Sequence, residues 1–65
     1  VTEYEGLCEA LARKFVGRAG AEFDDLVQEG RIAVWQSLQD GRAPSTSYVE
    51  YAMRMWVTTL RRQAS

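Results

Sequence analysis

The chain has 65 residues, of which 46% are hydrophobic and 26% are charged, with a formal net charge of −1 at pH 7. A chain of this length forms one domain that buries only about 60% of its unfolded surface, and its apolar content is too high for a disordered segment. The single cysteine, Cys8, excludes an internal disulfide, and no secretory signal or membrane-length apolar run occurs. We therefore expect one domain, residues 1–65, in the cytoplasm and without a membrane partner.

The charges are distributed unevenly along the chain. Residues 21–30 contain four acids and no base, whereas residues 51–65 contain three arginines and no acid. An acidic segment suits a basic partner, and a basic segment suits a polyanion. Charges placed to complement helix dipoles would give the same distribution, so charge alone leaves both interpretations open.

Apolar residues recur at helical spacing, which predicts an all-α fold with three helices. The first helix, at about residues 2–16, has one apolar face and ends near Val16 at the glycines of "GRAG". The second, at about residues 24–39, begins with Asp24 as its N-cap and ends at "DGRAP". The third, at about residues 47–62, begins with the capping-box spacing of Ser47 and Glu50.

The second predicted helix has two chemically different faces on a wheel of about 100° per residue. Gly30 weakens the helix by about 1 kcal/mol, and we expect it to let another helix pack closely. It belongs to the expected core face, with Leu26, Val27, Ala33, Val34 and Leu38. The opposite face carries Asp25, Gln28, Glu29, Ile32, Trp35 and Gln39. Such a mixture is typical of an interface anchored by the tryptophan, unless the first helix covers that side chain.

The run "FDDLVQEGRIAVWQSL" resembles region 2.2 of bacterial sigma factors of the sigma-70 family, in which a D-L-x-Q-E-G motif opens an apolar helix. The preceding "LARKFVG" is similar to region 2.1, and "YVEYAMRMWVTTLRR" is similar to the F-x-x-Y-A start of region 2.3. The resemblance implies a sigma region 2 fold whose second helix docks on the clamp helices of the RNA polymerase β′ subunit, with an anti-sigma factor as a further candidate partner. With Ile32 added from the wheel, the candidate polymerase-binding residues are Asp24, Asp25, Gln28, Glu29, Arg31, Ile32 and Trp35.

In this family the third helix reads and melts promoter −10 DNA, which requires aromatic surfaces and cations. Arg54 and Met55 stand where the principal members have a Trp-Trp pair, and the loop before the motif is reduced to "GRAPSTS". The pattern is therefore closer to divergent, alternative or phage-type members. Helical spacing favours a core position for Tyr51 and leaves Trp56 open between core and surface. The candidate DNA-binding residues are Tyr48, Tyr51, Arg54, Met55, Trp56, Arg61 and Arg62.

We do not expect an enzyme. The chain has no histidine, Cys8 has no evident base, and the neighbouring Asp24 and Asp25 diverge by about 100° on a helix, so they form no acid–base pair. Metal-ligand spacings and Gly-rich phosphate loops are missing from the sequence, so we expect no metal or cofactor. Besides a sigma-type initiation domain, two functions remain open. One is an RNA polymerase-binding modulator or decoy without promoter melting, and the other is a plain helical DNA-binding domain.

Overall fold

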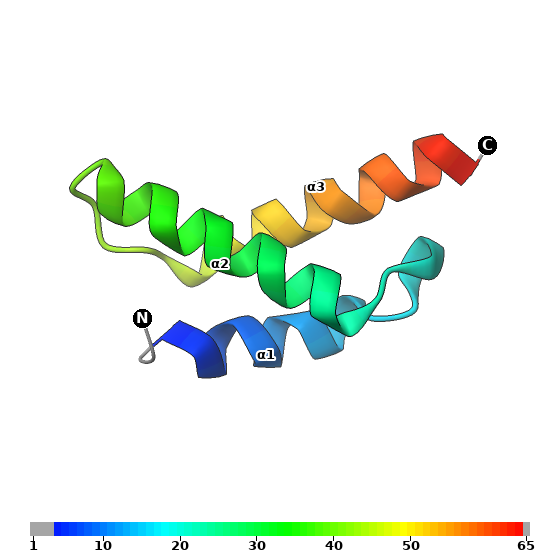
Figure 1. The fold of residues 1–65 in the computed structure, drawn as a ribbon, viewed down its shortest axis with the longest axis horizontal. Coiled ribbons are helices and arrows are strands. Elements are labelled where there is room, and N and C mark those ends of the chain that lie inside the picture. The colour runs from blue at the N-terminus through cyan, green and yellow to red at the C-terminus, as the bar shows by residue number, and fades with distance from the viewer. Residues whose placement is uncertain (1–3, 65) are drawn as a thin grey trace.

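The computed structural model describes residues 4–64, which form three α-helices and one short 3-10 helix. Helix α1 spans Glu5–Phe15, η2 spans Arg18–Gly20, α2 spans Phe23–Gln39 and α3 spans Thr46–Ala64. Each α-helix packs on the other two, and α3 also contacts η2. In Figure 1 the cyan turn between α1 and α2 and the orange-red end of α3 lie at the same end of the molecule. The described residues contain no strand, so the predicted all-α fold with three helices is confirmed.

Backbone geometry fixes the turn between α1 and α2. The predicted start of the first helix near residue 2 lies outside the described residues. The helix ends one residue before Val16, because Gly17 takes a φ of 88°, which glycine adopts without strain. Helix α2 follows an extended Glu22 that provides no side-chain cap. Asp24 is therefore not the N-cap as predicted, and it lies with Asp25 in the first turn, where the helix dipole favours anions.

The N-terminus of α3 is capped by a different residue from the one predicted. The backbone N–H of Tyr48 donates a hydrogen bond to Ser45 Oγ at 3.1 Å. The helix thus begins one residue earlier than expected, and Ser47 does not cap it. The carboxylate of Glu50 accepts a hydrogen bond from Lys14 of α1 at 2.9 Å instead of reaching back to Ser47. The predicted capping box is wrong because its acid serves a tertiary contact.

Within residues 4–64 no helix is both long and apolar enough to cross a membrane.

One hydrophobic core fills the space where the three helices meet. The largest side chains that are almost fully excluded from solvent are Leu26, Met53, Val49 and Cys8. The core is completed by Leu11, Ala12, Phe15, Ala21, Val27, Ala33, Val34 and Val57.

The predicted core face of α2 is wrong at its C-terminal end. Leu38 is 42% exposed, and Ser37 is buried beside it. Leu38 lies in the last turn of α2, where it lines an open pocket with Tyr4 and is not covered by α1. The apolar stripe therefore continues in the sequence beyond the point at which another helix packs on it.

The buried face of α3 also differs from the expected one. Tyr51, which helical spacing favours as a core residue, is 56% exposed, and the core positions are Val49, Met53 and Val57. Two stripes at helical spacing lie side by side on this helix, and only one is buried between the helices. Gly30 leaves room for the buried stripe, since a Cβ atom at that position would lie 2.7 Å from Met53 Cε.

Candidate functional site

The face of α2 that points away from the core presents polar and large apolar side chains to solvent. Trp35 is 60% exposed and Ile32 is 43% exposed. The alternative in which α1 covers Trp35 is therefore wrong. Exposed aromatic and aliphatic side chains among carboxylates and amides are typical of a protein–protein interface. This surface, called the α2 outer face below, consists of Asp25, Gln28, Glu29, Ile32, Trp35 and Gln39.

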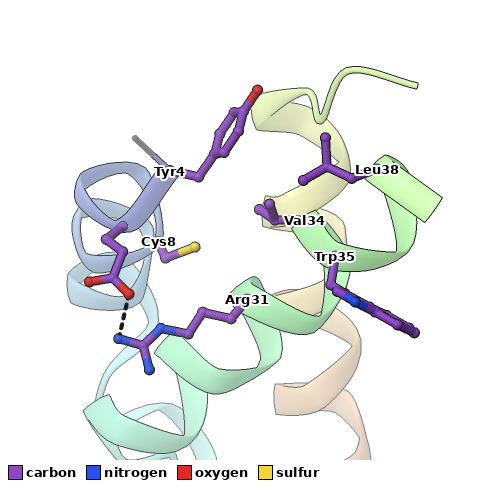
Figure 2. Close-up of a pocket in the computed structure, with 7 residues that line it drawn as sticks. Tyr4, Cys8, Arg31, Val34, Trp35 and Leu38 are labelled. Atoms are coloured by element: carbon purple, nitrogen blue, oxygen red, sulfur yellow. Dashed lines mark ion pairs between the residues drawn. The ribbon is translucent and has the colours of Figure 1, made fainter. Parts of the chain in front are cut away.

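Arg31 lies at the edge of the α2 outer face and is turned toward α1. Its Nη2 atom lies 2.8 Å from Glu5 Oε1, and both side chains are about half exposed (Figure 2). An exposed ion pair of this kind contributes at most about 1 kcal/mol. Arg31 can therefore exchange Glu5 for an acidic group of a partner at little cost. Asp24 is exposed at the other end of the face.

A pocket of about 230 Å³ opens between α1 and α2 beside Trp35. Its walls include Tyr4 and Cys8 on the α1 side and Val34 and Leu38 on α2. Figure 2 shows Trp35 at the rim, with its indole ring directed away from α1. The pocket is thus an apolar recess that adjoins the α2 outer face.

A groove of about 210 Å³ between α2 and α3 brings aromatic residues of α3 next to the α2 outer face. Glu29 and Ile32 line it from α2, and Tyr48, Tyr51 and Met55 line it from α3. The three α3 side chains are between 39% and 56% exposed. Exposed rings beside a mainly apolar groove are surfaces on which bases can stack.

Trp56 lies apart from these exposed side chains. It is half-buried and packs against the hydrophobic core. Its indole Nε1 is buried and has no hydrogen-bond partner in the described part of the chain. Stacking on a base requires an open ring face, so Tyr51 offers a better surface than Trp56.

Two of the three arginines of α3 line a second groove, on the side of α3 that faces α1, whereas Arg62 is exposed outside it. Arg54 and Arg61 border this groove of about 400 Å³ together with Lys14, Arg18 and Glu50. Lys14 holds the pKa of the Glu50 carboxyl below its usual range through a hydrogen bond and its positive charge. Five of the seven candidate DNA-binding residues of α3 therefore line one of the two grooves, and Trp56 and Arg62 line neither.

Two residues that line this second groove, Lys14 and Arg18, were missed by sequence reasoning. Lys14 belongs to α1 and Arg18 to η2, far from α3 in the sequence. They reach the arginines only because the end of α1 and the η2 turn pack against α3. Neither periodicity nor local charge indicates such a tertiary contact.

The described residues contain no group of three His, Cys, Asp or Glu side chains that could hold a metal ion. Cys8 is 1% exposed, and its burial raises the pKa of the thiol. We expect native Cys8 to resist thiol reagents at neutral pH and to react once the protein is unfolded in urea, because the thiolate is the reactive form. Labelling rates with a chromogenic disulfide reagent, with and without urea, measure this. Equal rates would contradict the buried position.

Comparison with known proteins identifies the family. The sequence model of the Sigma-70 region 2 family matches residues 1–65, which is the whole chain. No curated protein and no solved structure shows a significant match. The three-helix architecture agrees with the match, as does the position of "DLVQEG" on α2. The chain therefore belongs to the sigma-70 region 2 family, whose members act in transcription initiation.

Proposed function

We propose that this chain docks on the clamp helices of the RNA polymerase β′ subunit through the α2 outer face and presents α3 to promoter −10 DNA. Membership of the sigma-70 region 2 family supplies the role in transcription initiation. The observation that carries the assignment of the surface is the exposure of Trp35 and Ile32 on a face of α2 that also carries Asp25 and Glu29. No such combination is required for folding, since the core forms on the opposite face of the helix.

The energetics of interfaces support this choice of surface. Truncation of a tryptophan that becomes buried on binding typically costs about 2 kcal/mol or more of binding free energy, which defines a hot spot. Carboxylates on the same helix surface steer a basic partner and fix its register. Asp24, Asp25 and Glu29 supply that charge, and Gln28 supplies an amide with both donors and an acceptor.

Binding to a β′ clamp-helix fragment tests the proposal. We expect Glu29→Lys to weaken binding at least about tenfold, because a reversed charge within an interface costs more than 1.4 kcal/mol. Glu9→Lys is the matched control: it makes the same change in net charge at an exposed residue of α1 that does not belong to the α2 outer face. Circular dichroism should show that both variants remain helical.

The control separates a local contact from general electrostatics. If Glu9→Lys weakens binding as much as Glu29→Lys, only net charge matters, and the α2 outer face is not the docking surface. If the folded native chain does not bind the fragment at all, the docking proposal fails.

A polymerase-binding modulator without promoter melting is the second candidate. It is favoured by Arg54 and Met55 at the positions of the family's Trp-Trp pair and by the burial of Trp56 against the core. A promoter with a fluorescent base analogue in the −10 element distinguishes the two functions. Increased fluorescence with core polymerase supports initiation, whereas polymerase binding without that increase supports the modulator.

A further inference from the structure

Positive charge is concentrated in one place on this slightly acidic domain. The chain has eight Lys and Arg residues and a net charge of −1. Four of the eight line the groove between the end of α1, η2 and α3, where Glu50 is the single acid. A scattered, solvated distribution would not place half of the cations around one groove of about 400 Å³. The groove, called the cationic groove below, contains Lys14, Arg18, Arg54 and Arg61.

The backbone and an aromatic ring hold Arg18 at this groove. Gly17 N–H donates to the Ala21 carbonyl and Ala21 N–H donates to the Arg18 carbonyl, both at 2.9 Å, so the turn is closed on both sides of Arg18. The guanidinium lies over the Phe15 ring, 5.2 Å from its centroid. A cation–π contact leaves the edge of the guanidinium free to donate hydrogen bonds. Arg18 is therefore preorganised for an anion rather than mobile.

Helix α3 supplies two further cations in a row. Arg54 and Arg61 are seven residues apart, which is two helical turns or about 10 Å along the axis. Neither forms an ion pair within the described part of the chain. A row of this length exceeds a single anion and suits several charges along a strand. Tyr51 lies one turn before Arg54 and is exposed, so an aromatic surface adjoins the row.

We infer that the cationic groove binds the sugar–phosphate backbone of a DNA strand, with Lys14 and Arg18 extending the DNA surface of α3 onto α1 and η2. The inference rests on the proposed DNA role of α3 and adds a phosphate site on two other elements. Charged grooves that follow the backbone beside aromatic residues are the usual means of holding single strands. Phosphate contacts by arginine are short, charge-assisted and often bidentate.

Glu50 sets how readily the groove accepts a phosphate. Its carboxylate lies 2.9 Å from Lys14 Nζ and is ionised at neutral pH, so an incoming phosphate must compete with it for Lys14. Removing this charge frees the lysine and removes repulsion of the strand. Glu50→Gln is therefore expected to strengthen DNA binding, whereas loss of a groove cation weakens it.

Salt-dependent binding of fluorescent single-stranded DNA by the 65-residue chain tests the inference. Arg18→Gln and Arg61→Gln should each weaken binding about threefold or more and reduce the slope of log K against log salt by roughly 0.7, the value for one phosphate contact of a single strand. Glu50→Gln should tighten binding. Arg13→Gln is the matched control, because Arg13 precedes Lys14 on α1, is exposed and does not line the groove.

The outcomes separate this inference from the proposed function. Equal effects of Arg13→Gln and Arg18→Gln would mean that only net charge matters and would overturn the groove. No DNA binding by the native chain at low salt would also overturn it, while clamp-fragment binding still reports on the α2 outer face. If Tyr51→Ala loses DNA binding and Arg18→Gln does not, the inference about the groove is wrong, although α3 still binds DNA. If inorganic phosphate competes with the fluorescent strand as well as unlabelled DNA does, the groove is a small-anion site and the inference of a DNA strand is wrong.

Discussion

Leu26→Ala is expected to remove most of the stability of this domain, whereas Leu38→Ala leaves it folded. Both leucines lie on α2, but Leu26 is 0% exposed and Leu38 is 42% exposed. Deletion of a buried leucine side chain costs about 2–5 kcal/mol, because the transfer energy is lost and a cavity remains. The whole free energy of unfolding of a chain this size is only about 3–10 kcal/mol.

Urea unfolding followed by circular dichroism measures both variants against the native chain. Leu26→Ala should lower the midpoint strongly or abolish the transition, and Leu38→Ala should cost less than about 1 kcal/mol, since its surface is already partly solvated. Equal losses would show that the last turn of α2 is covered in solution. The pair is a matched comparison because residue type, substitution and helix are the same.

The leucine pair also marks where sequence reasoning succeeds and where it stops. Helical periodicity predicts the α2 core face correctly at Leu26, Val27 and Val34, because these positions lie where other helices pack. It fails at Leu38, since the wheel contains no information on where a neighbouring helix ends. The exposure of Trp35 has the same origin: the sequence leaves two alternatives, and only the path of α1 decides between them.

The sequence predicts the part of the candidate site that lies on a single helix and misses the part that several elements form together. The α2 outer face is a local property of one helix, so residue spacing brings Glu29, Ile32 and Trp35 together without knowledge of the fold. The cationic groove combines α1, η2 and α3, and its composition depends on how these elements pack. On α3, the sequence offers two stripes at helical spacing, and only the packing of the helices, in which Met53 lies against Gly30, shows which stripe is buried.

That contact leads to the second large prediction: Gly30→Val should strongly destabilise the native packing of α3 on α2. A Cβ atom at Gly30 would lie 2.7 Å from Met53 Cε and 3.1 Å from Cys8 Sγ. Both neighbours are almost completely buried, so an added side chain fits only if Met53 and Cys8 leave their native positions in the core. Valine adds two more methyl groups, and overpacking of a filled core costs about 1–3 kcal/mol or more. The gain in helix propensity over glycine is less than about 1 kcal/mol, so the steric cost dominates.

Gly6→Val is the matched control for this change. Gly6 also lies in a helix, but nothing is within 4 Å of its Cβ position, and its variant should be as stable as the native chain or slightly more so. Chemical unfolding of the two variants gives the comparison. A folded Gly30→Val of native stability would mean that α2 and α3 are further apart in solution. A second measurement isolates part of the contact: Gly30→Ala should cost less in a Cys8→Ala background than alone, because the shortened side chain removes the 3.1 Å approach to Cys8 Sγ and the two sites are coupled. The helix-weakening glycine inside the "DLVQEG" motif then has a structural reason, which is that it sets the distance between the helix with the proposed polymerase surface and the helix with the proposed DNA surface.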